Sequence, residues 1–150
     1  MALLRGEAFI GNNVPKVNSP ITAYKAMNSA AGLQLINSSH TPGIGGLGVA
    51  LAKTAFAGEY GLHISLEKIP RTTNCEHSIL YSESNSRFIV TVSPDKKDAF
   101  ESVMDGVEYA QVGYVTSDPI LNIDGIAGQN IVSENILTLK DNWKKTLGGI

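Results

Sequence analysis

The residues best suited to chemistry form a glycine-rich stretch that runs from His40 to Gly58. An apolar run precedes it, so we expect a strand to lead into a turn at Gly43, Gly45 and Gly46, after which a helix begins. Such a turn leaves backbone N–H groups pointing outward, a geometry that suits an anion such as phosphate. Glycines at this spacing also allow close packing of a strand on a helix without any ligand, and both interpretations stay open.

The other reactive residues of the sequence do not form a recognisable catalytic set. His40, His63 and His77 have no carboxylate or cysteine at the spacing of metal ligands. Neither a Gly-x-Ser-x-Gly elbow nor a glycine loop that ends in Gly-Lys-Ser/Thr occurs. Cys75 lacks the flanking residues of a catalytic thiol. We therefore predict no catalytic residue and no metal ligand in this chain.

Composition and charge narrow the classes of protein that fit. The 150 residues are 43% hydrophobic and 17% charged, which predicts one domain around one core. A formal net charge of -2 makes nucleic acid an unlikely partner. A single cysteine fits a reducing compartment, and there is no apolar run of about 18 residues or leader pattern. We expect a cytoplasmic protein with no membrane partner.

The hydrophobic pattern predicts the elements that position the glycine stretch. Ser19 and Pro20 begin a helix that Gly32 ends. Its buried face is expected to carry Ile21, Tyr24, Met27 and Ala31. Residues 33–38 form the strand before the turn. The helix at 46–57 is apolar on most sides, so it should be buried on more than one side.

The second half continues with alternating strands and helices. Residues 58–69 alternate as a half-exposed strand, with Leu62, Ile64 and Leu66 on its buried face. A strand at 87–92 precedes a helix that begins at Ser93 and Pro94, and its inner face is expected to carry Ala99, Phe100, Val103 and Met104. Strands follow at 109–115 and 120–123, with a short extended piece at 130–132. The last helix is expected to begin at Thr138, paired with Asp141.

This order of elements predicts an α+β fold. We expect a mixed sheet of four to five strands with helices packed mainly on one side. Residues 1–18 are expected to form an irregular N-terminal segment, and residues 19–150 a single domain.

The glycine stretch and a second stretch, Ser-Glu-Ser-Asn-Ser-Arg-Phe at 82–88, together carry a resemblance to a known family. They resemble the C-terminal domain of the aminoimidazole ribonucleotide synthetase superfamily, and within it most of all the phosphoribosylformylglycinamidine synthases. The resemblance covers residues 5–147. It implies the fold of that domain, a short helix within 72–81, and a place as the last domain of a longer multidomain ligase.

The resemblance also implies a function. Synthases of this family use ATP and Mg²⁺ to convert formylglycinamide ribonucleotide, with ammonia from glutamine, to the amidine in purine biosynthesis. Most nucleotide and metal ligands come from N-terminal domains that this sequence lacks, so the segment alone is expected to be inactive. The implied partners are those N-terminal domains, a glutaminase subunit and a small accessory subunit. A dimer of the isolated domain stays open.

The resemblance selects candidate residues for binding a substrate or nucleotide phosphate, namely His40, Gly43, Gly45, Gly46, Glu83, Ser84, Asn85 and Arg87. His40 either steers a phosphate or holds the turn by hydrogen bonds. The motif around Glu83 corresponds to a ribonucleotide contact in the first copy of the family's repeated unit, and we favour a rigid link in this copy. Arg87 either pairs with Glu83 or faces the neighbouring domain.

One departure from the family pattern concerns metal binding. Thr41 and Ile44 stand where many family members have aspartates, and hard cations prefer carboxylate oxygens. Two alternatives remain open for the whole chain. The first is a related superfamily member, such as selenophosphate synthetase, thiamine-monophosphate kinase or the hydrogenase maturation type. The second is a non-catalytic assembly module.

Overall fold

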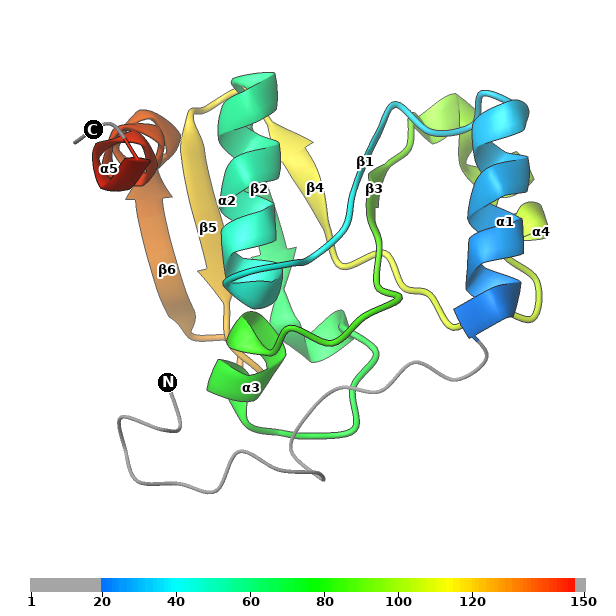
Figure 1. Cartoon of the computed structure of the whole chain (residues 1–150), viewed down its shortest axis with the longest axis horizontal. Coiled ribbons are helices and arrows are strands. Elements are labelled where there is room, and N and C mark those ends of the chain that lie inside the picture. The colour runs from blue at the N-terminus through cyan, green and yellow to red at the C-terminus, as the bar shows by residue number, and fades with distance from the viewer. Residues whose placement is uncertain (1–19, 148–150) are drawn as a thin grey trace.

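The larger part of the molecule is built on a four-stranded mixed sheet (Figure 1). The computed structural model describes residues 20–147 of the chain. The strands lie in the order β4 (Gly113–Thr116), β2 (Gly61–Ser65), β5 (Ile120–Asp124) and β6 (Asn130–Asn135). β2 and β5 are parallel, and the other neighbouring pairs are antiparallel. The α+β fold with a mixed sheet is therefore confirmed.

Helices cover one face of this sheet. They are α2 (Gly46–Gly58), α3 (Glu76–Tyr81) and α5 (Ile136–Leu147), and β2 runs into a short 3-10 helix, η2 (Leu66–Lys68). α2 contacts α3, α5 and β2, which confirms its predicted burial on more than one side. The main core lies between this helix layer and the sheet, and its fully buried side chains include Leu51, Leu66, Ile79, Leu121, Ile123 and Ile136.

A second hydrophobic cluster lies beside the first. It joins α1 (Pro20–Gly32) to α4 (Lys97–Val103), which follows the short 3-10 helix η3 (Pro94–Lys96). Its buried members are Ala26, Ala30, Phe100 and Met104. The antiparallel pair β1 (Ser38–His40) and β3 (Ile89–Thr91) runs between the two parts of the molecule (Figure 1). The described residues thus bury two clusters, whereas the length predicted one core.

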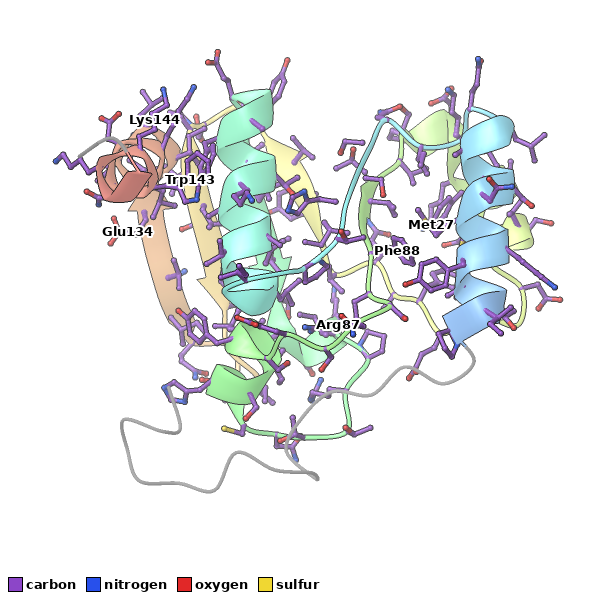
Figure 2. The ribbon with its side chains drawn as sticks, viewed as in Figure 1. Met27, Arg87, Phe88, Glu134, Trp143 and Lys144 are labelled. Atoms are coloured by element: carbon purple, nitrogen blue, oxygen red, sulfur yellow. The ribbon has the colours of Figure 1, made fainter. Side chains whose placement is uncertain are left out.

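The buried face of α1 differs from the predicted one. Ala23, Ala26 and Ala30 are buried, whereas Ile21 and Tyr24 are 68% and 51% exposed. Met27 is half-buried and Ala31 is exposed. The small side chains of this alanine stripe let α4 approach α1 closely. Close packing therefore buries the alanine face of α1 rather than the face that carries its larger apolar side chains. Tyr24 instead meets Phe88 edge to face, with ring centroids 5.4 Å apart, and Figure 2 shows Phe88 beside this helix.

The strand before the glycine turn begins later than predicted. Residues 33–35 form the turn that ends α1, because the N–H of Leu35 bonds to the carbonyl of Ala30 at 2.9 Å. Gln34 has a φ of 55°, in the left-handed region that commonly ends a helix. The strand β1 therefore begins at Ser38, and the prediction of a strand over 33–38 was wrong in its position.

Other predictions agree with the described residues in burial more than in strand length. Leu62, Ile64 and Leu66 are buried as predicted, but the strand predicted over 58–69 is only β2, and Leu66 lies in η2. The strand predicted over 109–115 likewise begins only at Gly113.

The expected short helix within 72–81 is α3. Phe100 in α4 and Met104 directly after it are buried as predicted, whereas Val103 is half-buried and Ala99 is exposed. The segment predicted for residues 1–18 lies outside the described residues. No helix within residues 20–147 has the length and apolar character needed to cross a bilayer.

The last helix begins two residues before the predicted cap. α5 begins at Ile136, and the side-chain oxygen of Asn135 accepts the N–H of Leu137 at 2.8 Å. This is the bond that an asparagine N-cap makes to the second helical residue. Thr138 therefore lies inside the first turn, and the prediction that it starts the helix was wrong. The rings of Trp143 and Phe56 are in contact, with centroids 5.9 Å apart, which holds α5 against α2. Figure 2 shows Trp143 beside α5.

Substitution of the two candidate caps tests this assignment. Asn135→Ala should lower the free energy of unfolding by about 1 kcal/mol, because the N–H of Leu137 loses its acceptor. Thr138→Ala is the matched control and should change it by less than about 0.5 kcal/mol. Urea unfolding of both variants measures the difference. A larger loss for Thr138→Ala than for Asn135→Ala would contradict the assignment.

Candidate functional site

The glycine turn is built by backbone geometry rather than by side chains. The N–H of Gly46 donates to the carbonyl of Gly43 at 2.8 Å, which closes a four-residue turn. Gly45 has φ 85° and ψ 4°, the values of the third position of a type II turn, where glycine is favoured. Ile44 lies at the tip and is 92% exposed. The turn therefore presents an apolar side chain outward at the N-terminus of α2.

Gly46 brings the turn directly against the end of α3. A side chain added at Gly46 would place its Cβ 2.7 Å from the carbonyl oxygens of Leu80 and Ser82. Gly46 also has a φ of 65°, which disfavours residues with a side chain. The backbone of the first stretch therefore packs on the backbone that leads into the second stretch. The structure brings the two sequence stretches together.

A hydrogen bond joins the same two stretches. The N–H of Gly45 donates to Oε1 of Glu83 at 2.9 Å. A carboxylate at the N-terminus of a helix is favoured by the helix dipole and by the charge on the acceptor. The sequence had suggested that the turn leaves its N–H groups free for an anion. Two of them, on Gly45 and Gly46, are instead bonded within the chain.

Arg87 fastens the second stretch from its other end. Its guanidinium donates to the carbonyl of Ser82 and, at 3.2 Å, to the carbonyl of Ser84. Among the residues that the structure describes, Arg87 forms no ion pair with Glu83. Burial lowers the pKa of Arg87 from its ordinary value. Arg87 thus holds the loop in shape, and Figure 2 shows it between the two parts of the molecule.

Two serine hydroxyls of the second stretch are buried without partners. Ser82 is 1% exposed, and the Oγ atoms of Ser82 and Ser84 have no hydrogen-bond partner among residues 20–147. Buried polar atoms are nearly always paired in native proteins, since an unpaired one costs about 1–3 kcal/mol. The two hydroxyls are therefore polar groups of the loop whose burial is not compensated within the described residues.

Other candidate residues lie outside this contact. His40 ends β1, where it is paired in register with Ile89, and no side-chain hydrogen bond connects it to the described turn residues. Asn85 is exposed. Thr41 is exposed as well, so neither position that departs from the family aspartates is buried. Within residues 20–147, no group of three or more His, Cys, Asp or Glu side chains is arranged to hold a metal ion.

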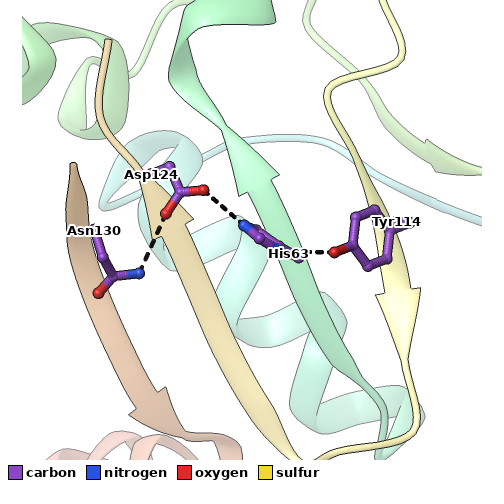
Figure 3. A network of polar contacts seen from close by, with 4 residues as sticks. All are labelled: His63, Tyr114, Asp124 and Asn130. Atoms are coloured by element: carbon purple, nitrogen blue, oxygen red, sulfur yellow. Dashed lines mark hydrogen bonds and ion pairs between the residues drawn. The ribbon is translucent and has the colours of Figure 1, made fainter. Parts of the chain in front are cut away.

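Sequence reasoning missed a polar row on the face of the sheet opposite the helices. Figure 3 shows Tyr114, His63, Asp124 and Asn130, one from each of the four strands. His63 Nδ1 lies 2.8 Å from the Tyr114 hydroxyl, and Nε2 lies 2.7 Å from Asp124 Oδ2. Asn130 Nδ2 donates to Asp124 Oδ1 at 3.3 Å. The alternation of β2 places His63 on the polar face, but no sequence signal pairs it with a residue on β5.

Comparison with known proteins gives a family match over most of the chain. Residues 7–125 match the family model described as AIR synthase related protein, C-terminal domain. The chain is 37% identical over 114 residues to the phosphoribosylformylglycinamidine synthase subunit PurL of Limosilactobacillus reuteri, which covers 75% of this chain and 14% of that protein. The PurL of Leuconostoc mesenteroides is 40% identical over 90 residues, which covers 60% of this chain and 11% of that protein. The chain thus spans about one seventh of the length of such relatives.

Solved structures show the same fold at low sequence identity. Thermotoga maritima PurL complexed with FGAR superposes with a TM-score of 0.71 and 19% identity, over 81% of this chain and 21% of that one. T. maritima PurL complexed with ATP gives a TM-score of 0.69 at 20% identity, over 79% and 21%. A HypE–HypF complex gives 0.61 at 21% identity, over 90% and 47%. These similarities concern the fold alone.

Substitution of two turn glycines tests the close contact between the stretches. Gly46→Ala should lower the free energy of unfolding by about 2 kcal/mol or more, because a side chain there adopts a left-handed conformation and meets the backbone of residues 80–82. Gly43→Ala is the matched control. A Cβ at Gly43 meets nothing within 4 Å, so the change should stay below about 0.5 kcal/mol. Equal effects in urea unfolding would contradict the contact.

Proposed function

Because the chain belongs to the family of AIR synthase related protein C-terminal domains, we propose that it is the C-terminal domain of a phosphoribosylformylglycinamidine synthase. The whole enzyme converts formylglycinamide ribonucleotide to the amidine, with ATP and with ammonia from glutamine. It is a cytoplasmic enzyme of purine biosynthesis. The curated relatives named PurL support this assignment more specifically than the fold, which the HypE structure shares.

The observation that carries the proposal is the meeting of the two stretches at one end of α2. The hydrogen bond from Gly45 to Glu83 and the close backbone contact at Gly46 make them one continuous wall. Ile44 is exposed at its tip, and the buried hydroxyls of Ser82 and Ser84 are unpaired within the described chain. A wall with these features is suited to face a ligand or a neighbouring domain.

Individual residues of this wall have different proposed roles. Glu83 and Arg87 hold the two stretches in place through their bonds to backbone atoms. By the geometry of an α-helix, the N–H groups of residues 47–49 lack partners within α2, and these are the backbone groups proposed to receive an anion. The turn at Gly43, Gly45 and Gly46 positions them, because the N–H groups of Gly45 and Gly46 are themselves bonded within the chain. His40 and Asn85 are the proposed side-chain contacts to the ribonucleotide or nucleotide phosphate, and Ser84 would join them if its buried hydroxyl turned outward.

ATP and Mg²⁺ would act mainly through the rest of the full-length enzyme. The donor groups of the wall are backbone N–H, hydroxyl and amide groups, which fit a phosphate rather than a cation. The chain's own part is to orient a phosphorylated ligand and to exclude water beside it. The proposed partners are the N-terminal domains of the same chain, a glutaminase subunit and a small accessory subunit. A solved PurLQS assembly of Thermotoga maritima, which contains a similar chain, supports such partners.

Transfer of the domain into a relative tests the function. We expect L. reuteri PurL to keep ATP-dependent amidine formation when its matching segment is replaced by this chain. Its kcat/KM should fall by no more than about a hundredfold, equivalent to roughly 2.7 kcal/mol of transition-state stabilisation. This chain alone should show no turnover, and the relative without the segment is the control. Turnover by the isolated chain, or a folded but inactive chimera, would contradict the proposal.

Variants of Glu83 in the same chimera test whether its carboxylate is a link or a ligand contact. Glu83→Gln keeps an oxygen acceptor for the N–H of Gly45, so the KM for formylglycinamide ribonucleotide should stay within about twofold of that of the parent chimera. Loss of the charge at the N-terminus of α2 should lower the stability by only about 0.5 kcal/mol. Glu83→Ala removes the acceptor and should lower the stability by about 1 kcal/mol. A KM raised about tenfold in Glu83→Gln at unchanged stability would instead show direct contact between the carboxylate and the substrate.

A further inference from the structure

The polar row on the open face of the sheet has the connectivity of a hydroxyl assisted by a general base. The Tyr114 hydroxyl contacts one nitrogen of His63, and the other nitrogen contacts the Asp124 carboxylate (Figure 3). Serine hydrolases use the same order of groups, with hydroxyl, imidazole and carboxylate in a chain. In this row a phenol takes the place of the serine hydroxyl.

Charge and hydrogen bonding fix the direction of the protons along the row. The hydrogen bond from His63 lowers the pKa of Asp124, the bond from Asn130 lowers it further, and partial desolvation opposes both. An ionised carboxylate only accepts hydrogen bonds, so Nε2 of neutral His63 carries the proton. In this tautomer Nδ1 has a free lone pair, so the 2.8 Å contact with the Tyr114 hydroxyl is a hydrogen bond in which the hydroxyl donates. The imidazole is thereby set to take the phenol proton.

Packing holds the phenol and imidazole in this arrangement while leaving the phenol open to solvent. Tyr114 and His63 are register partners on the neighbouring strands β4 and β2, and their ring centroids are 5.2 Å apart. Tyr114 is 60% exposed, and the His63 side chain is 36% exposed. Tyr114 is therefore open to solvent over most of its surface, where a small electrophile can approach it.

Another tyrosine provides an internal comparison. Tyr60 is 59% exposed, almost the same as Tyr114. Its hydroxyl has no hydrogen-bond partner among the described residues, whereas that of Tyr114 is bonded to an imidazole. A difference in reactivity between these two phenols therefore reports the effect of His63 rather than that of solvent access.

We propose that Tyr114 is a nucleophilic modification site for activated acyl donors, with His63 as its general base and Asp124 as the group that orients His63. In the step, the phenol oxygen forms a bond to the acyl carbon while His63 Nδ1 takes the phenol proton. The bond from the acyl carbon to its leaving group breaks, and the leaving group departs with the electron pair. His63 then passes the proton to the leaving group or to water, and an O-acyl tyrosine remains.

Acetylation by N-acetylimidazole tests the proposal on the whole chain. The acyl carbon leaves imidazole and forms an ester with the phenol, and peptide mass spectrometry measures the rate at each tyrosine. Tyr114 should react about tenfold faster than Tyr60, below the 10²–10⁴-fold typical of buried general bases because this site is open to water. Tyr114→Phe should remove the fast product and leave acetylation of Tyr60 unchanged.

Two further variants separate base assistance from simple exposure. His63→Gln keeps a hydrogen-bond acceptor but has no basic nitrogen, so the rate at Tyr114 should fall to that of Tyr60. Asp124→Asn keeps the shape of the carboxylate without its charge, and its rate should lie between the two. The Tyr60 rate and a urea unfolding curve verify that each variant is folded. Equal rates at Tyr114 and Tyr60 in the parent chain, or an unchanged ratio in His63→Gln, would overturn the proposal.

Discussion

The close approach of Gly46 to the backbone of residues 80–82 is the constraint on which the arrangement of the site depends. No side chain fits between the start of α2 and the end of α3, since a Cβ at Gly46 would lie 2.7 Å from two carbonyl oxygens. This contact places Gly45 within hydrogen-bonding distance of Glu83. It also fixes the N-terminus of the central helix, whose other sides pack on β2 and α5. Because Gly46 has no side chain, it determines both the geometry of the loop and the position of α2 in the core.

Alternation along β2 determines what each face of the sheet can do. Leu62 and Ile64 are buried against the helix layer, and His63 between them lies on the opposite face. One strand therefore supplies Leu62 and Ile64 to the main core and His63 to the polar row. The row spans all four strands, because His63 on β2 pairs with Tyr114 on β4 and bonds to Asp124 on β5. Asn130 on β6 is in turn the register partner of Asp124. A shift of one residue in β2 would exchange the two faces and remove both.

Local patterns were sufficient for some features and not for others. The start of α2 at Gly46 and the burial of Leu62 and Ile64 follow from glycine position and alternation, which depend on neighbouring residues only. The buried face of α1 depends on how closely α4 approaches, a tertiary distance that favours alanine and that a helical wheel does not contain. The cap of α5 is Asn135, at the end of β6, because the strand runs directly into the helix. His63 and Asp124 are 61 residues apart in the sequence. Their hydrogen bond depends on the order of the strands in the sheet, so no local spacing predicts it.

The sheet also separates two kinds of chemistry that the chain carries. The wall formed by residues 43–46 and 82–87 lies beside the helix layer, where Gly45 and Glu83 meet at the start of α2. The row of Tyr114, His63 and Asp124 lies on the other face, beyond the buried side chains of Leu62 and Ile64. A covalent change at Tyr114 adds a group to the open face without displacing a residue of the main core. The two proposals therefore depend on different residues, and the failure of either one would leave the structural basis of the other intact.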